Sequence, residues 1–296
     1  MKILITGGKG QLGTELFTCL ENKKTEIGIP SILTEKNDVT SIDVDVLDIT
    51  DLNQVEDYFK KHKFDCIINC AAYTNVDKCE EDLETAFKVN AIGPRNLAIA
   101  AEKIGAKLIH ISTDYIFSGE GTQPFVEWDN PAPQSIYGKT KALGERYVSE
   151  FCSRYFIIRT AWLYGYYGNN FVKTIMRVAK EQGEIKVVDD QRGNPTNAAD
   201  LAHHILKLAV TEEYGIYHGT GTGECSWYDF SVKIVEFAKI NAKVNPCTTE
   251  EFPRPAKRPA YSSLENMMFK VTVGDDFRQW EVALKYFIEN LEENLK

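Results

Sequence analysis

The feature that most constrains the fold is an apolar strand that runs directly into a glycine-rich turn at the N-terminus. Lys2–Thr6 is followed by Gly7-Gly8-Lys9-Gly10-Gln11-Leu12-Gly13, and helical spacing of leucines then predicts a helix over Gln11–Leu20. Glycines suit this turn because the chain must bend tightly, its backbone must approach a pyrophosphate, and the helix must pack against the strand. The first turn of the helix offers N–H groups and partial positive charge to phosphates. Gly7, Gly10 and Gly13 therefore predict a dinucleotide site.

Strand-like and helical segments alternate through the first half of the chain. We expect strands at Asp38–Val44, Asp65–Cys70 and Ala106–Ser112, and helices at Asp51–His62 and Asp82–Ile104, the latter bent near Gly93-Pro94. Glu21–Asn37 is interpreted as a polar excursion between the first helix and the second strand. Such alternation predicts an α/β fold with a Rossmann-like, doubly wound parallel sheet.

The second half is less regular and has no single linker. Its expected strands are Tyr155–Thr160, Ile185–Val188 and a Gly-rich strand near Ile216–Gly219, and its expected helices are Ile136–Phe151, Asn170–Gln182, Asn197–Ala209, Ser226–Ile240 and Asp275–Leu295. Pro246–Pro259 is expected to be a surface loop. We predict a dinucleotide-binding domain over residues 1–160 and a smaller, discontinuous α/β substrate domain mainly over 161–296, with some later segments returning to the first domain.

Charge and composition exclude several partners. The 296 residues hold 43 acids against 34 bases, a net charge of -9, which argues against nucleic acid or an anionic membrane as the main partner. No apolar run approaches the ~18 residues of a membrane span, and Ile3-Leu4-Ile5 is too short for a signal peptide. The seven scattered cysteines contain no CxxC pair, so reduced thiols and a cytoplasmic location are expected.

A tyrosine and a lysine with helical spacing form the candidate catalytic pair. Tyr137 and Lys141 stand on one helix face, where residues four apart lie ~5–6 Å from each other at Cβ. A neighbouring ammonium is expected to lower the tyrosine pKa from its reference value of about 10. Tyr137 can then act as general acid towards a carbonyl oxygen that accepts a hydride. Upstream, Ser112 and Thr113 end a predicted strand and can hydrogen-bond the same carbonyl.

An aspartate at the end of the second predicted strand bears on the choice of cofactor. Asp43 is placed to accept a hydrogen bond from the 2′-hydroxyl of NADH and to repel the 2′-phosphate of NADPH. Lys9 is the one contrary sign, because its ammonium could reach that phosphate. NADH is therefore expected to be preferred, with NADPH accepted. Asp48 could meet adenine, although either aspartate could instead cap a helix or end a strand.

Taken together, these segments resemble the dTDP-4-dehydrorhamnose reductase family of the extended short-chain dehydrogenase/reductase superfamily. The resemblance rests on Gly10–Gly13, Asn69–Asp77, Ser112–Phe117, Tyr137–Lys141 and Arg159–Gly165, and it is extended by Asp189–Thr196, Arg254-Pro255 and Arg258-Pro259. It implies a Rossmann-like domain and a smaller substrate domain. It also implies reduction of dTDP-4-dehydro-β-L-rhamnose to dTDP-β-L-rhamnose by NADH or NADPH. A similar nucleotide sugar is the alternative substrate.

The resemblance implies roles for individual residues. Tyr137 is the proton donor, Lys141 holds the nicotinamide ribose, and Thr113 steadies the sugar carbonyl. The implied cofactor contacts are Gly10, Gln11 and Leu12 at the pyrophosphate, Asp48 and Ile49 at the adenosine, and Ala71, Ala72, Tyr73 and Asn90 around the third cofactor-facing loop. The implied sugar pocket consists of Val76, Asp114 and Trp162, although Trp162 could instead be core.

The outer candidates have two interpretations each. Arg254 could contact the nucleotide phosphates or pair with surface acids, and Asn170 and Lys173 could meet the diphosphate or solvent. Some relatives hold Mg²⁺ at a subunit interface through glutamates, which admits a homodimer, and Glu15 stands at a matching place. A lone glutamate on an exposed helix face is usually solvated, so no metal is expected.

Two other functions remain open. The first is another nucleotide-sugar reaction of the superfamily, such as an epimerase or dehydratase. Dehydratases usually pair the aspartate after the Ser/Thr position with a glutamate, whereas Tyr115 follows Asp114 here. The second is a non-catalytic, dinucleotide-binding regulatory subunit. The joint presence of Thr113, Tyr137 and Lys141 argues against it, because a pure binder needs no acid–base pair.

Overall fold

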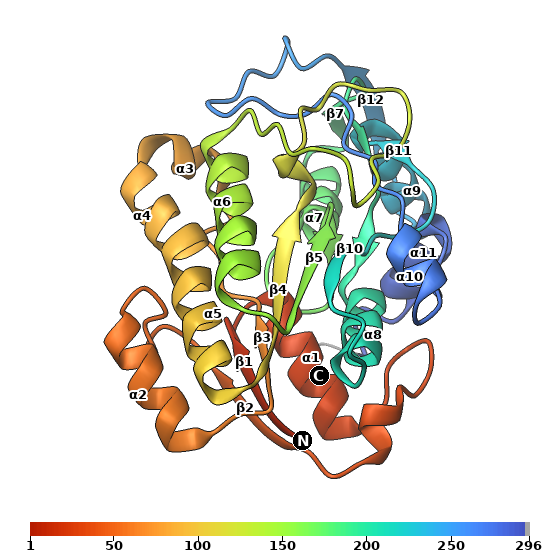
Figure 1. Ribbon diagram of the computed structural model, residues 1–296. Helices are drawn as coiled ribbons and strands as arrows, with labels where there is room; N and C mark the ends of the chain where they lie inside the picture. Colours follow the sequence, from red (N-terminus) through yellow and green to blue (C-terminus); the bar gives the residue numbers. More distant parts are fainter. Residues whose placement is uncertain (294–296) are drawn as a thin grey trace.

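A six-stranded parallel sheet forms the centre of the computed structural model, which describes residues 1–293 (Figure 1). Its spatial order is β2-β1-β3-β4-β5-β10. The strands are β1 (Lys2–Thr6), β2 (Asp38–Ile42), β3 (Cys66–Asn69), β4 (Lys107–Thr113), β5 (Tyr155–Thr160) and β10 (Gly215–His218). All neighbouring pairs are parallel, which confirms the predicted α/β class.

Helices cover both faces of this sheet. Successive side chains of a strand point to opposite faces, so Ile3 and Ile5 of β1 join one apolar cluster and Leu4 joins the other. The first cluster is covered by α1 (Gln11–Asn22) and α8 (Ala198–Ala209), and the second by α2 (Leu52–His62), α5 (Gly93–Ile104) and α6 (Ile136–Phe151) (Figure 1). This arrangement is the predicted doubly wound fold.

The strand order changes direction between β1 and β3. The chain leaves β1 for β2 at one edge and then crosses back to β3 on the other side of β1. Ligands of open α/β sheets bind outside the carboxyl ends of the strands at such a switch point. The glycine turn after β1 and the Cys70–Tyr73 segment after β3 both lie there.

A third apolar cluster is built on elements that lie towards the carboxyl ends of β4 and β5 (Figure 1). It is built on α7 (Phe171–Gln182), α9 (Trp227–Phe237) and α11 (Trp280–Glu289), with the parallel pair β7 (Glu184–Val188) and β12 (Lys243–Cys247). Two short pairs accompany it: β6 (Leu163–Tyr164) with β9 (Thr196–Asn197), and β8 (Arg192–Gly193) with β11 (Cys225–Ser226). Strand β10 and helix α8 come from the same half of the chain but pack with the central sheet.

Several elements differ from the sequence-based expectation. The helix expected over Asp82–Ile104 is divided into α4 (Leu83–Phe87), the π-helix η2 (Lys88–Ile92) and α5, which begins at Gly93. Helix α11 begins at Trp280 rather than Asp275, and Leu295 lies outside the described residues. Pro246 and Cys247 were expected in a loop but belong to strand β12, because they pair with Val187 and Val188 of β7. Short elements that had no clear periodicity are α3 (Val76–Glu81), α10 (Met267–Val271), and the 3₁₀ helices η1 (Ser31–Thr34) and η3 (Asp114–Ile116).

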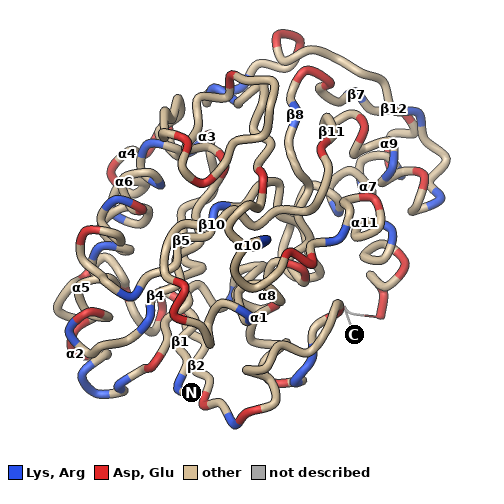
Figure 2. The backbone as a smooth tube through the Cα atoms, turned by 45° about the vertical axis from the view of Figure 1, so that its right-hand side comes forward, with Lys and Arg blue, Asp and Glu red and all other residues tan. Residues whose placement is uncertain are grey.

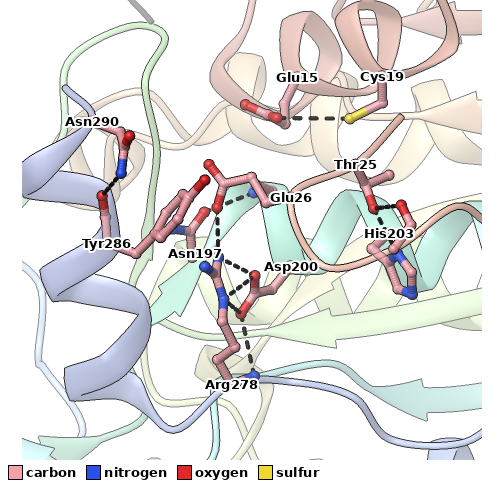
Figure 3. A network of polar contacts seen from close by, with 12 residues as sticks. Glu15, Cys19, Thr25, Glu26, Asn197, Asp200, His203, Arg278, Tyr286 and Asn290 are labelled. Carbon is pink, nitrogen blue, oxygen red and sulfur yellow. Dashed lines mark hydrogen bonds and ion pairs between the residues drawn. The ribbon is translucent and has the colours of Figure 1, made fainter. Parts of the chain in front are cut away.

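The excursion over Glu21–Asn37 is anchored to distant parts of the chain. Ile32 and Leu33 are buried in the first apolar cluster. Glu26 accepts a hydrogen bond from Arg278 at 2.7 Å, and Arg278 also pairs with the buried Asp200 of α8 (Figure 3). The expectation of a purely polar excursion is therefore wrong, because its partners come from residues some 170–250 positions later and leave no local pattern.

Charges are interspersed over the surface of the described residues. Figure 2 shows that α2, α5 and α6 each carry both Lys or Arg and Asp or Glu. No helix between Met1 and Glu293 is long and apolar enough to cross a membrane.

Candidate active site

The glycine turn brings the start of α1 against the end of β3. Gly7 has a positive φ of 68°, and a Cβ there would lie 2.6 Å from the backbone nitrogen of Ala71. A Cβ on Gly13 would lie 2.3 Å from the carbonyl oxygen of Gly7, so the helix can approach the strand only with glycine at that position. No described side chain caps the N-terminus of α1, whose first turn faces a cavity. These N–H groups fit the pyrophosphate of a dinucleotide.

A cavity of about 310 Å³ lies at the switch point of the sheet. The predicted residues that line it are Gly7, Gly10, Asp43, Asp48, Ile49, Ala71, Ala72 and Tyr73. Asp43 accepts hydrogen bonds from the backbone N–H groups of Lys9 at 3.1 Å and Val44 at 2.8 Å. The Lys9 ammonium lies 2.9 Å from Asp45 and is largely exposed. The structure thus brings both predicted aspartates to the wall of this cavity, which we call the adenosine cavity.

A larger cavity of about 620 Å³ adjoins the adenosine cavity and shares Gly10, Cys70 and Ala72 with it. We call it the catalytic cavity. The predicted residues that line it are Gly10, Gln11, Leu12, Gly13, Val76, Thr113, Asp114, Tyr137, Lys141 and Trp162. The structure therefore brings all three catalytic candidates together with the glycine turn.

The first turn of α6 carries Tyr137 into the catalytic cavity. Ser135 caps this helix by accepting a hydrogen bond from the N–H of Gly138 at 3.1 Å. A Cβ on Gly138 would lie 2.1 Å from the carbonyl oxygen of Tyr115, so glycine permits the helix to press against η3. Burial raises the pKa of Tyr137, while a hydrogen bond with Thr113 opposes this effect. The phenol is thus protonated at neutral pH and can donate its proton.

Lys141 is buried and turned towards β4. Its Nζ donates a hydrogen bond to the carbonyl oxygen of Ile111 at 2.6 Å and lies 3.5 Å from Nε2 of His110. Burial lowers the Lys141 pKa to about 8, against the charge of Glu145. The expectation that Lys141 lowers the pKa of Tyr137 is not met in this arrangement, because burial of the phenol dominates and the ammonium is held by a backbone carbonyl.

Polar groups at the ends of β4 and β5 complete the catalytic cavity. Thr113 donates a hydrogen bond to Asp114 at 2.9 Å, and burial raises the pKa of Asp114 to about 6. The hydroxyl oxygens of Ser112 and Thr160 are buried and find no hydrogen-bond partner among the described residues. Buried polar groups normally have partners, so this wall fits the hydroxyls of a sugar or a ribose.

Two tryptophans form an aromatic wall of the catalytic cavity. The rings of Trp162 and Trp227 are stacked, with centroids 3.5 Å apart and planes 7° apart, and both line the cavity. Trp162 has a positive φ of 48°, which is costly for a bulky side chain and is held here by packing against Gly193 and Trp227. Sequence reasoning missed Trp227, because nothing local to the start of α9 indicates a cavity.

Four predicted site residues do not line either cavity. Asn90 is buried and holds the backbone of Tyr73 through two hydrogen bonds. Asn170 caps α7 and donates a hydrogen bond to the side chain of Gln11, the first residue of α1. It therefore contacts the glycine turn segment without lining the cavity. Lys173 donates to the carbonyl oxygens of Tyr166 and Gly168, and Arg254 lies over the ring of Phe252. Asn90, Asn170 and Lys173 are held by protein hydrogen-bond partners outside the two cavities, and this accounts for their positions.

Glu15 lies on α1 and lines a separate pocket. Its carboxylate accepts a hydrogen bond from Cys19, and burial raises its pKa to about 7 (Figure 3). Within residues 1–293, no group of three or more His, Cys, Asp and Glu side chains is arranged to hold a metal ion.

Comparisons with known proteins cover almost the whole chain. The family model described as the RmlD substrate binding domain matches residues 1–293. A spore coat polysaccharide biosynthesis protein, SpsK of Bacillus subtilis, is 39% identical over 97% of both chains. A crystal structure of a dTDP-4-dehydrorhamnose reductase from Clostridium acetobutylicum is 50% identical, with a TM-score of 0.93 over 99% of this chain and 100% of that one. Another, from Bacillus anthracis in complex with NADP, is 44% identical, with a TM-score of 0.91 over 98% and 99%.

Proposed function

The chain belongs to the RmlD substrate binding domain family, and from this premise we propose that it is an NAD(P)H-dependent dTDP-4-dehydrorhamnose reductase. The reaction is reduction of the 4-keto group of dTDP-4-dehydro-β-L-rhamnose, which yields dTDP-β-L-rhamnose. Structures at 44% and 50% identity that carry this name support the activity, and the complex with NADP supports the dinucleotide.

One observation carries the proposal. Thr113, Tyr137 and Lys141 line the same cavity as the uncapped first turn of α1, and that cavity continues into the adenosine cavity. A hydride donor and a carbonyl acceptor must lie side by side for transfer, and a proton donor must reach the carbonyl oxygen. The joined cavities supply one continuous site for both molecules.

Tyr137 is proposed as the proton donor. Its phenol is protonated at neutral pH, because burial raises its pKa. As negative charge grows on the carbonyl oxygen, the phenol donates its proton to that oxygen. Thr113 orients the oxygen when its hydroxyl hydrogen turns from Asp114 towards the substrate. The buried Lys141 can approach a ribose hydroxyl from the same face of α6.

The chain's residues fit a dinucleotide along both cavities. The first turn of α1 would bind the pyrophosphate, and Asp43, Asp48 and Ile49 would contact the adenosine. When bound, the reduced nicotinamide supplies the hydride. Ala71, Ala72 and Tyr73 would cover the cofactor, and Asn90 would hold that segment in place through the backbone of Tyr73.

The proposed sugar pocket combines polar and aromatic walls. Asp114 and Ser112 can exchange hydrogen bonds with sugar hydroxyls, whereas Val76 and the stacked pair of Trp162 and Trp227 offer apolar area. A 6-deoxy sugar has one apolar methyl edge and one hydroxylated edge. The two walls match these edges.

Cofactor preference, assembly and location are further parts of the proposal. Asp43 favours the 2′-hydroxyl of NADH over the 2′-phosphate of NADPH, and Lys9 is already paired with Asp45. We propose a modest preference for NADH, a homodimer and a cytoplasmic location. We also propose a dinucleotide-binding domain over residues 1–160 and a substrate domain mainly over 161–296. The return of β10 and α8 to the central sheet supports its discontinuous form.

The test is turnover of enzymatically generated dTDP-4-dehydrorhamnose with NADH and with NADPH, followed at 340 nm and by analysis of the sugar nucleotide. We expect stoichiometric oxidation of cofactor and formation of dTDP-rhamnose. Interconversion of sugars without net oxidation would indicate an epimerase. Dinucleotide binding without turnover on a panel of nucleotide 4-ketosugars would indicate a regulatory subunit.

A further inference from the structure

A buried histidine stands behind Lys141 and belongs to neither wall of the catalytic cavity. His110 lies on β4, is completely buried, and has Nε2 at 3.5 Å from Nζ of Lys141. Its other ring nitrogen, Nδ1, lies 2.9 Å from the side-chain amide nitrogen of Asn69, at the end of β3. The two contacts link β3 to the catalytic helix through one imidazole ring.

The orientation of the Asn69 amide is fixed by a backbone donor. The N–H of Ala71 can only donate, and its acceptor is the Asn69 carbonyl oxygen at 3.1 Å. The hydroxyl of Thr6 donates to the same oxygen at 2.8 Å. The amide nitrogen of Asn69 must therefore face His110.

This orientation determines the tautomer of His110. An amide nitrogen can only donate, so Nδ1 of His110 must accept and carries no proton. Burial and the neighbouring Lys141 lower the His110 pKa well below its ordinary value, so the ring is neutral and its single proton lies on Nε2. Nε2–H is then a donor that faces the nitrogen of Lys141.

A donor facing an amine distinguishes the two protonation states of that amine. The neutral amine has a lone pair that can accept the Nε2–H, whereas the ammonium has only N–H groups to present. We propose that His110 is a positioning residue that acts through Lys141: Asn69 fixes its Nε2–H against the lysine nitrogen, and this contact favours the neutral amine and orients it beneath the catalytic cavity.

The other groups around Lys141 do not favour its neutral amine in the way that the Nε2–H of His110 does. Glu145 lies one turn later on α6 and favours the ammonium, but its carboxylate is engaged by Arg159 in a buried pair at 2.9 Å. Cys70 faces Lys141 from the end of β3, and burial raises its thiol pKa to about 12, so it is uncharged at neutral pH. The carbonyl of Ile111 accepts from either form of the lysine.

The consequence for catalysis rests on the proposed reductase function. Burial lowers the Lys141 pKa to about 8, whereas that of Tyr137 is raised, so Lys141 is the group of the pair that titrates near neutral pH. Its ammonium is present below this pKa and is lost as the pH rises through it. Because its contact favours the neutral amine, His110 shifts the alkaline limit of activity to lower pH.

A matched pair of variants isolates the donor. In both His110→Asn and His110→Gln, the new side-chain carbonyl can accept the hydrogen bond from Asn69. Only the longer side chain of His110→Gln can also present an N–H near the position of Nε2. His110→Asn keeps the first contact and loses the second, and His110→Phe serves as a second donor-free variant should His110→Asn not fold. The Nζ resonance of Lys141 is titrated in the full-length, ¹⁵N-lysine-labelled chain, with its signal assigned by its loss in Lys141→Gln.

We expect the Lys141 midpoint to rise by about half a pH unit or more in His110→Asn, a roughly threefold change in protonation equilibrium, and to stay near the parent value in His110→Gln. The alkaline limb of kcat should move in the same sense. Equal midpoints in all three proteins, or equal shifts in both variants, would overturn the inference. The titration needs no substrate, so its outcome does not depend on whether the parent is a reductase. Turnover by the parent tests the reductase function separately.

Discussion

The two joined cavities differ in how they hold their polar groups. In the adenosine cavity, Asp43 and Asp48 are only half-buried, and their contacts there are backbone N–H groups and a neighbouring hydroxyl. In the catalytic cavity, Asp114, Tyr137 and Lys141 expose 9% or less of their surface, and burial shifts the pKa of each. The carboxylates of the adenosine cavity are therefore held mainly by backbone N–H groups and remain partly exposed to solvent. The functional side chains of the catalytic cavity are removed from solvent.

The difference indicates where affinity and rate are set. Contacts to backbone N–H groups and to half-exposed carboxylates are individually modest and tolerate substitution. A proton donor in a buried cavity has no substitute, and its protonation state depends on its surroundings. We therefore expect substitutions in the catalytic cavity to change kcat strongly and substitutions in the adenosine cavity to change mainly cofactor choice.

The sharpest separation of rate from affinity comes from Tyr137→Phe. We expect kcat to fall by ~10²–10⁴-fold, because only the hydroxyl can donate the proton, while the ring keeps its packing against Tyr115. Steady-state turnover and a fluorescence titration of the reduced cofactor provide the two readouts. A variant that retains half of the parent's activity would remove Tyr137 from its role.

Lys141→Ala should affect both quantities. We expect kcat to fall by roughly 10²-fold and the cofactor dissociation constant to rise by about tenfold, because the lysine is proposed to hold the ribose and so to position the nicotinamide for hydride transfer. Lys139→Ala is the matched control, since Lys139 lies on the same helix and is exposed. A defect confined to kcat would contradict the ribose contact.

Asp114→Asn tests the electrostatic character of the catalytic cavity through stability. Burial raises the Asp114 pKa from 3.8 to about 6, so the folded chain binds more protons than the unfolded chain between these values and loses stability as the pH rises through them. The variant should therefore be more stable than the parent by about 1–3 kcal/mol at pH 7.5, with the difference shrinking towards pH 4. Denaturant titrations at both pH values measure it, and a difference independent of pH would show that burial of the charge is not the cause.

The smallest effect is expected in the adenosine cavity. Asp43→Ala should lower the ratio of kcat/KM for NADH over NADPH by up to about tenfold, because one half-exposed carboxylate contributes ~1 kcal/mol. Lys9 is paired with Asp45, so the parent should favour NADH modestly. An unchanged ratio, or a parent that favours NADPH, would mean that Asp43 does not face the ribose.

The sequence predicted those parts of the molecule whose signals are local. The strand–turn–helix unit, the alternation of β3, β4 and their helices, and the Tyr137–Lys141 spacing all depend on residues close together in the chain. The glycine turn could therefore be placed after the first strand from the sequence, whereas the order of the strands and the switch point between β1 and β3 came from the structure.

Features made by distant residues could not be predicted in this way. The stack of Trp162 on Trp227, the anchoring of Glu26 by Arg278 and the contact of His110 with Lys141 each join separate elements. Arg254 and Lys173 were predicted to contact the substrate, but Lys173 donates to the carbonyl of Tyr166 and Arg254 lies over the ring of Phe252, and neither lines the adenosine or the catalytic cavity. A side chain's type gives its chemistry, whereas its target depends on the packing of the whole chain.

The central claim is that the catalytic cavity transfers a hydride to a sugar carbonyl next to Tyr137. The most direct measurement uses NADH dideuterated at the nicotinamide C4 with dTDP-4-dehydrorhamnose, and NMR analysis of the sugar nucleotide formed. The expected product is dTDP-rhamnose with one deuterium at C4 of the sugar for each cofactor oxidised. Oxidised cofactor without deuterium in the sugar, or an unchanged 4-keto sugar, would contradict the claim.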